Sequence, residues 1–220
     1  MRYLKKEPKD VVDFQLAAYE QMHGYQPTNI VRAHDEAYEY DWVEGMHCRQ
    51  WKAVWDATKV ACWDGDTQPI ERYNREAYTH YVLCASIDTH VSASHITAAT
   101  SIILRAPLTP VRMCHGDLTF ANVILHPHCG VILIDPGCDR GLTCREMDES
   151  KLLQSLDGFD EAYRGWTPTP AQSACFWPAP IHWALLLTHY VRMLRHVNEV
   201  GQAFARRRIK EINEWLRAHA

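Results

Sequence analysis

The sequence predicts an α+β protein in which a small strand-containing lobe precedes a larger, mainly helical one. Short strand-like runs on either side of one helical run occupy residues 1–45, and helical periodicity dominates residues 46–220. The chain has 220 residues, which is enough to bury a sizeable core. We therefore expect two parts, 1–45 and 46–220, each organised around its own secondary structure.

The elements of the small lobe follow from residue types. The run "MRYLKK" predicts a strand that Pro8 ends, and "KDVVDFQLAAYEQM" behind it has the apolar spacing of a helix. The run "TNIVRAHDEAYEYDWVEG" alternates and breaks at "HDE". This pattern predicts two strands joined by a turn and ended by Gly45.

Helices make up most of the remainder. A helical pattern begins at "MHCRQWKAVWDATKVACW", and one long helix is expected over residues 71–104. The runs "VRMCHGD", "NVILH" and "GVILIDPG" predict strands or strand-loop segments, and "MDESKLLQSLDG" begins another helix. A Pro-rich connection, "TPTPAQSACFWPAP", then leads to two closing helices.

Composition and charge exclude several classes of protein. The net charge is −4, and the one basic run, residues 206–208, lies in a helical segment, which argues against a general nucleic-acid binder. No apolar leader follows Met1, and no run approaches the roughly 18 apolar residues of a membrane span. The eight cysteines include no CxxC pair, so reduced thiols are expected. We expect a cytoplasmic protein that binds neither nucleic acid nor membrane.

One local group of possible metal ligands is "HPHC", residues 126–129. It falls between two apolar runs, where the turn of a hairpin is expected. A turn with incidental ligands is therefore favoured over a zinc site.

Polar residues with a defined spacing follow the helical part. Asp117 and Asn122 are five residues apart in "HGDLTFAN", and Asp135 ends the apolar run "VILID". A loop carboxylate can accept a hydroxyl proton, while an amide oxygen and a second carboxylate are hard ligands suited to Mg²⁺. In phosphoryl transfer the protein mainly aligns the nucleophile and neutralises charge, so few residues are needed. The set therefore indicates phosphoryl transfer.

These motifs resemble the aminoglycoside phosphotransferase and choline kinase-like branch of the protein-kinase-like fold. The chain has "HGDLTFANVI", "LIDPG" and "DESKLLQS", where the family has a HGDLxxxNil loop, liDpg and D-x-x-KL-x-x-S. The residues of these motifs, together with a later "YVRMLRH", are most similar to those of small kinase-like proteins found near capsule and surface-sugar genes. The likeness is strong over 111–155, moderate over the closing helices and weak before residue 45. It implies a two-lobe fold, with ATP and Mg²⁺ where the lobes meet.

The resemblance assigns roles residue by residue. Within a catalytic loop over 113–124, it implies that Asp117 is the catalytic base and that His115 braces the loop. It also implies that Asn122 and Asp135 are the Mg²⁺ ligands.

The segment implied to bind metal spans 131–141, and the helix after it begins near Asp148. Asp148 is expected either to brace the site or to cap its helix, because "DESK" is itself a reasonable helix start. Lys151 is a further candidate for binding phosphate.

The nucleotide side departs from the family pattern. The family's hairpin over the phosphates, with its Gly-rich loop, has no counterpart in this sequence. If the first strand is the family's lysine strand, Lys5 or Lys6 would reach the phosphates. The partner would come from the following helix, where Gln15 aligns best and Asp13 and Glu20 are alternatives.

The run "YEYDWVEG", residues 38–45, resembles the hinge that receives adenine through backbone groups. Asp41 and Val43 are therefore expected beside the nucleotide. The implied reaction moves the γ-phosphoryl group of ATP to a hydroxyl of a small molecule, a sugar or an amino alcohol. The alternative is a pseudokinase, a nucleotide-dependent binding protein without turnover. A third possibility is that an N-terminal hairpin precedes residue 1 or that another chain covers the site; the oligomeric state stays open.

Overall fold

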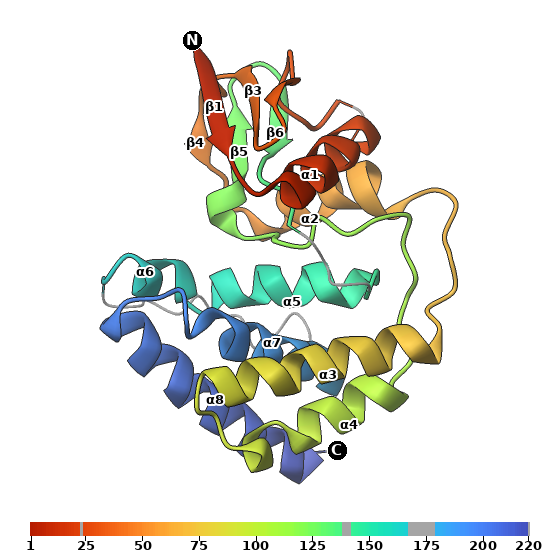
Figure 1. Cartoon of the computed structure of the whole chain (residues 1–220), viewed down its shortest axis with the longest axis vertical. Helices are drawn as coiled ribbons and strands as arrows, with labels where there is room; N and C mark the ends of the chain where they lie inside the picture. Colours follow the sequence, from red (N-terminus) through yellow and green to blue (C-terminus); the bar gives the residue numbers. More distant parts are fainter. Residues whose placement is uncertain (23, 138–141, 167–178, 220) are drawn as a thin grey trace. The chain divides into compact units, whose positions relative to one another are not determined.

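The computed structural model describes residues 1–22, 24–137, 142–166 and 179–219. Helix accounts for 54% and strand for 13% of the chain, and the sheets are small and antiparallel, which confirms the α+β class. The chain divides into two compact units (Figure 1). The first comprises Met1–Gln68 and Val111–Asp139, and the second comprises Pro69–Pro110 and Arg140–Ala220.

The first unit contains the N-terminal sheet. Strand β1 (Arg2–Lys6) pairs antiparallel with β3 (Ala37–Asp41), which also pairs with β2 (Val31–His34), giving the order β1-β3-β2. Lys5 lies directly opposite Tyr38, and opposite residues of an antiparallel pair share a face. Because successive side chains alternate, Lys6 lies on the other face from Lys5.

Helix α1 (Lys9–Gln21) follows Pro8 and contacts β3. Proline is common at a helix start, because its fixed φ suits the helix and because it has no backbone N–H to leave unsatisfied there. The helix buries Val12, Gln15, Ala18 and Tyr19. The strand, the helix and the two further strands expected from the sequence are therefore confirmed.

A second small sheet completes the first unit. Strands β4 (Met46–His47), β5 (Val123–His126) and β6 (Gly130–Leu133) pair in the order β4-β5-β6. The "HPHC" residues form the expected hairpin turn, in which His126 Nδ1 accepts hydrogen bonds from the backbone N–H groups of His128 and Cys129. Leu133 N–H also donates to Tyr25 O at 2.7 Å, which attaches the hairpin to the N-terminal residues.

Two expectations for the first unit are wrong. Helix α2 spans Trp51–Thr58 and continues as a π-helical turn to Trp63, whereas Met46–His47 is a strand. The run "VRMCHGD" is not a strand of either sheet. Its backbone N–H groups form hydrogen bonds with the end of the π-helical turn instead. Arg112 N–H donates to Trp63 O, and Met113 N–H donates to Cys62 O.

The second unit is helical within the described residues. Helix α7 (Pro180–Met193) is its most buried long helix, and it contacts α3, α4, α5 and α8. Nearly every side chain from Ile181 to Val191 is buried, which agrees with the apolar run "IHWALLLTHYV". The helices around it are α3 (Arg72–Asp88), α4 (Thr97–Arg105), α5 (Arg145–Leu156), α6 (Phe159–Tyr163) and α8 (Glu199–His219).

The long helix expected over 71–104 is two helices. Helix α3 ends where the Thr89 hydroxyl donates to Ala85 O at 2.7 Å and His90 adopts φ 55°. A left-handed residue cannot continue an α-helix, so the chain turns before α4 begins at Thr97.

The compact units do not follow the expected division at residue 45. Residues 46–68 and 111–139 belong with the strands of the first unit, since β4 and β5 are paired to each other there. Residues 167–178 of the expected Pro-rich connection, and 138–141 of the expected metal-binding segment, lie outside the described residues. No helix in the described ranges is both long and apolar enough to cross a membrane.

A buried ion pair joins two helical segments of the second unit. Arg208 Nε lies 2.7 Å from Asp157 Oδ2, which also accepts a hydrogen bond from Tyr190 at 2.6 Å. Only 8% of the Asp157 side chain and 18% of the Arg208 side chain are exposed. Desolvation raises the pKa of Asp157 even though the charge of Arg208 opposes that shift.

We expect Arg208→Leu to lower the free energy of unfolding by about 3 kcal/mol, because it leaves Asp157 buried without its counter-charge. The deficit should shrink as the pH falls toward the raised pKa of Asp157, since a protonated carboxyl needs no cation. Denaturant unfolding at pH 7 and pH 4.5 measures both effects. Arg207→Leu is the matched control, because Arg207 is exposed; an equal loss in both variants would contradict the assignment.

Candidate functional site

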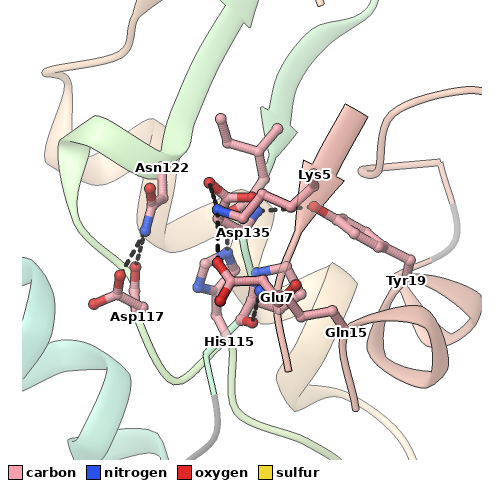
Figure 2. A network of polar contacts seen from close by, with 10 residues as sticks. Lys5, Glu7, Gln15, Tyr19, His115, Asp117, Asn122 and Asp135 are labelled. Carbon is pink, nitrogen blue, oxygen red and sulfur yellow. Dashed lines mark hydrogen bonds and ion pairs between the residues drawn. The ribbon is translucent and has the colours of Figure 1, made fainter. Parts of the chain in front are cut away.

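The loop between Asp117 and Asn122 closes on itself. Asn122 Nδ2 donates to both the backbone O and Oδ2 of Asp117, each at 2.8 Å, and Thr119 N–H donates to the same backbone O. A 3-10 turn over Phe120–Asn122 sets this spacing. Because the amide nitrogen is directed at Asp117, the amide oxygen of Asn122 points away from it, as Figure 2 shows. The five-residue spacing in the sequence therefore corresponds to one hydrogen-bonded loop.

Asp135 lies two residues after β6 in an unusual backbone conformation. Its φ is 51°, in the left-handed region that non-glycine residues rarely occupy. Its backbone N–H donates to the Tyr19 hydroxyl at 2.8 Å, and its Oδ2 accepts from Lys5 Nζ at 3.1 Å. Its other carboxylate oxygen, Oδ1, is buried and has no hydrogen-bond partner within the described residues. That oxygen is therefore available to a ligand.

Lys5 is the cation of the site. Its Nζ lies 3.1 Å from Asp135 Oδ2 and 3.4 Å from Glu7 Oε1, and 19% of its side chain is exposed. Burial lowers the pKa of Lys5, but the charge of Asp135 and the bonds to Asp135 and Glu7 outweigh burial and raise it. Lys5 is therefore protonated at neutral pH and offsets part of the negative charge of the two carboxylates.

His115 and Gly137 join the two polar loops. The buried His115 ring has Nε2 3.0 Å from Ile134 O, so Nε2 carries the proton, and Gly137 N–H donates to His115 O at 2.7 Å. A Cβ on Gly137 would lie 2.9 Å from Asp117 Cβ, so only glycine allows this close approach. The two contacts place Asp135 beside the loop of Asp117 and Asn122 (Figure 2).

A cavity of about 260 Å³ adjoins Asp135 within the first unit. Its walls are aromatic and aliphatic, and the rings of Tyr3 and Tyr40 lie 5.2 Å apart between centroids. Burial raises the pKa of Tyr40, and the charge of Asp135 adds to that shift, so its hydroxyl stays neutral. Flat apolar walls suit a planar ring. A carboxylate at the edge of such a cavity can hold an anionic group attached to that ring when a cation lies between the two. The lining residues are Tyr3, Tyr40, Trp42, Val43, Gly45, His47, Ile124, Ile134 and Asp135.

The structure brings together most of the residues expected from the sequence. Lys5, His115, Asp117, Asn122 and Asp135 form the arrangement described above, all within the first unit rather than divided between two lobes.

The other residues expected at the nucleotide lie as follows. Val43 lines the cavity, and Lys6 lines a separate hollow with Pro8 and His34 on the other face of the sheet. The Asp41 carboxylate accepts hydrogen bonds from Thr28 and Asn29, and its backbone N–H donates to Thr28 O. Strand alternation explains why Lys5 and not Lys6 reaches Asp135.

Among the three residues considered as partners of the lysine, none pairs with Lys5 in the described contacts. Asp13 pairs with Lys9 and Arg32, and Gln15 donates from Nε2 to Pro136 O at 3.1 Å. The partners of Lys5 are Asp135 and Glu7.

Tyr19 is a residue of the site that the sequence did not indicate. Tyr19 belongs to the run "KDVVDFQLAAYEQM", whose apolar spacing predicts a helix, and it is 2% exposed, but its hydroxyl contacts the Asp135 backbone. The only signal available was its position four residues after Gln15, on the same face of α1.

Asp148 and Lys151 lie in the second unit. Asp148 is fully buried in the first turn of α5, and the N-cap is Cys144, so the interpretation of Asp148 as an N-cap is wrong. Lys151 Nζ contacts Gln154 Oε1 at 2.9 Å. Its part in phosphate binding stays a prediction.

Comparison with protein-family models, with curated proteins and with solved structures found no match for this chain.

Replacing Gly137 tests the close approach of the two loops. We expect Gly137→Ala to lower the free energy of unfolding by about 1–3 kcal/mol, because the added Cβ forces Asp117 and the 134–137 loop apart. Gly130→Ala is the control: it adds a Cβ at φ 78° in the hairpin turn with nothing within 4 Å. The amide NMR signals of Gly116 and Asp117 should shift in the first variant alone. Equal shifts in both would contradict the contact.

Proposed function

We propose that the chain is an ATP- and Mg²⁺-dependent phosphotransferase of the protein-kinase-like type, acting on a hydroxyl of a small molecule. The observation that carries this proposal is the grouping of Asp117, Asn122 and Asp135, with Lys5 paired to Asp135. This is the set of groups that phosphoryl transfer requires: a base for the hydroxyl, oxygen ligands for a metal and a cation for phosphate.

The residues present fit a magnesium ion. Asp135 Oδ1 is a buried carboxylate oxygen without a hydrogen-bond partner in the described structure, and such an oxygen is costly unless a ligand satisfies it. The amide oxygen of Asn122 is a second hard donor. Mg²⁺ commonly uses one or two carboxylates together with substrate phosphates, so Asn122 and Asp135 would suffice to hold it. A bound Mg²⁺ ion would neutralise the negative charge of the phosphates.

The protein residues each have a distinct part in the reaction. Asp117 accepts the proton of the attacking hydroxyl, and the hydrogen bonds from Asn122 fix the direction of its carboxylate. Lys5, protonated at neutral pH, attracts the phosphates. His115 holds the loop against Ile134, so that Asp117 and Asp135 keep their separation.

The adenine ring would occupy the cavity beside Asp135. Tyr3 and Tyr40 offer aromatic surface, and Ile124 and Ile134 offer aliphatic surface, which together suit a flat purine. Val43 lies at the segment that resembles the adenine-binding hinge. The acceptor class, a sugar or an amino alcohol, rests on the resemblance of the "HGDLTFAN" and "IDPG" motifs.

Asp135→Asn tests the metal site. We expect the gain in ATP affinity on adding Mg²⁺ to fall by about 10- to 100-fold, because the variant loses the anionic ligand. Calorimetric titration of ATP with and without Mg²⁺ measures this gain. Asp56→Asn on α2 makes the same charge change at an exposed position and should keep the wild-type gain. The proposal fails if the wild type binds no purine nucleotide under either condition.

Asp117→Asn tests the base. We expect turnover with a sugar or amino-alcohol acceptor to fall by about 10²–10⁴-fold while ATP affinity is retained, because the base acts on the acceptor hydroxyl. A coupled assay for ADP release across a panel of such acceptors measures turnover. A wild type that binds MgATP but transfers phosphate to none of them would favour the pseudokinase alternative.

A further inference from the structure

We propose that Tyr19 and Gln15 are positioning residues that hold the backbone of Asp135 and Pro136, so that helix α1 sets the direction of the metal-binding carboxylate. This inference rests on the proposed function. It adds two residues that touch neither metal nor nucleotide and act only through Asp135.

The two side chains form a two-point clamp. Gln15 and Tyr19 are four residues apart on α1, so they lie on one face of the helix, one turn from each other. Tyr19 accepts the N–H of Asp135 at 2.8 Å, and Gln15 donates to the carbonyl of the next residue, Pro136, at 3.1 Å. Both are nearly inaccessible to water, with 2% and 5% exposure. Figure 2 shows both approaching the Asp135 segment from α1.

The clamp acts on a residue whose backbone needs support. Asp135 has φ 51°, and the left-handed region is disfavoured for any residue with a Cβ. Surrounding contacts must therefore hold this conformation. The N–H bond to Tyr19 fixes the peptide plane that precedes the Asp135 Cα. The bond from Gln15 fixes the plane that follows Pro136, whose ring restricts its own φ, so the two bonds restrain the segment from which the carboxylate projects.

Lys5 completes the hold on Asp135 from the sheet. Its bond to Oδ2 fixes one carboxylate oxygen, and the buried Oδ1 is the remaining one. The backbone is thus held by α1 and the side chain by β1. Gln15 is neutral and does not pair with Lys5 among the described contacts, so α1 influences the site through the backbone of Asp135 rather than through a charge on the lysine.

The hydroxyl of Tyr19 is suited to this task. Burial raises its pKa well above the ordinary value, with added contributions from Tyr38 and the charge of Asp135, so it remains a neutral phenol. Its ring packs against that of Tyr38 with centroids 6.0 Å apart. Phenylalanine would keep this packing and remove the hydroxyl, which accepts the Asp135 N–H and also interacts with Tyr38.

The test compares Tyr19→Phe with Tyr78→Phe in the full chain. Tyr78 is a fully buried tyrosine of the second unit whose hydroxyl bonds to Thr188 at 2.7 Å, so the control removes an equally buried hydroxyl away from Asp135. Gln15→Leu removes the second contact. Two quantities are measured: hydrogen exchange of the Asp135 amide in the ligand-free protein, and calorimetric ATP affinity with and without Mg²⁺.

We expect Tyr19→Phe to accelerate exchange of the Asp135 amide by about tenfold and to reduce the Mg²⁺-dependent gain in ATP affinity by about tenfold, while Mg²⁺-free binding is unchanged. Gln15→Leu should reduce the same gain, and Tyr78→Phe should alter neither quantity. Unchanged exchange in Tyr19→Phe, or a gain that falls no further than in the control, overturns the inference.

These results separate the inference from the proposed function. If Asp135→Asn abolishes the Mg²⁺-dependent gain and Tyr19→Phe leaves it intact, the clamp is overturned and the metal site stands. If the wild type itself shows no such gain, the metal site and the positioning role fall together.

Discussion

The contact between the His115 loop and the Ile134–Gly137 segment is the interaction on which the rest of the site depends. His115 donates to Ile134 O, and Gly137 N–H donates back to His115 O. The second bond requires a residue without Cβ, because the backbone of Gly137 passes against Asp117. Together with the bond from Ile134 N–H to Asn122 O and the pairing of β5 with β6, they keep Asp135 beside Asp117 and Asn122.

Attraction between opposite charges stabilises the group of Lys5, Glu7 and Asp135. Two carboxylates, Glu7 and Asp135, face one lysine, and burial alone would disfavour all three charges. The raised pKa of Lys5 shows that its two acids outweigh the desolvation.

Local patterns predicted most of the secondary structure because they depend on neighbours in sequence. Alternation of residue types predicted β2 and β3, and the break at Pro8 predicted the boundary between β1 and α1. The apolar runs on either side of "HPHC" predicted the β5–β6 hairpin. The failures have non-local or stereochemical causes. The "VRMCHGD" backbone bonds to the distant turn at Cys62 and Trp63, and a left-handed His90 divides a run that is helical by periodicity.

The spacing of the polar groups in the candidate site follows from the amino-acid sequence alone. Asp117 and Asn122 are close enough in the chain to share one hydrogen-bonded loop, and Asp135 ends a buried strand run. The choice between Lys5 and Lys6 as the contact of Asp135 depends on the fold, because the pairing of Lys5 with Tyr38 sets the face on which each side chain lies. The contacts of Gln15 and Tyr19 also depend on the fold, since their partners are more than a hundred residues away in the chain. Helical periodicity indicates which side chains are buried, but not which group a buried hydroxyl or amide contacts.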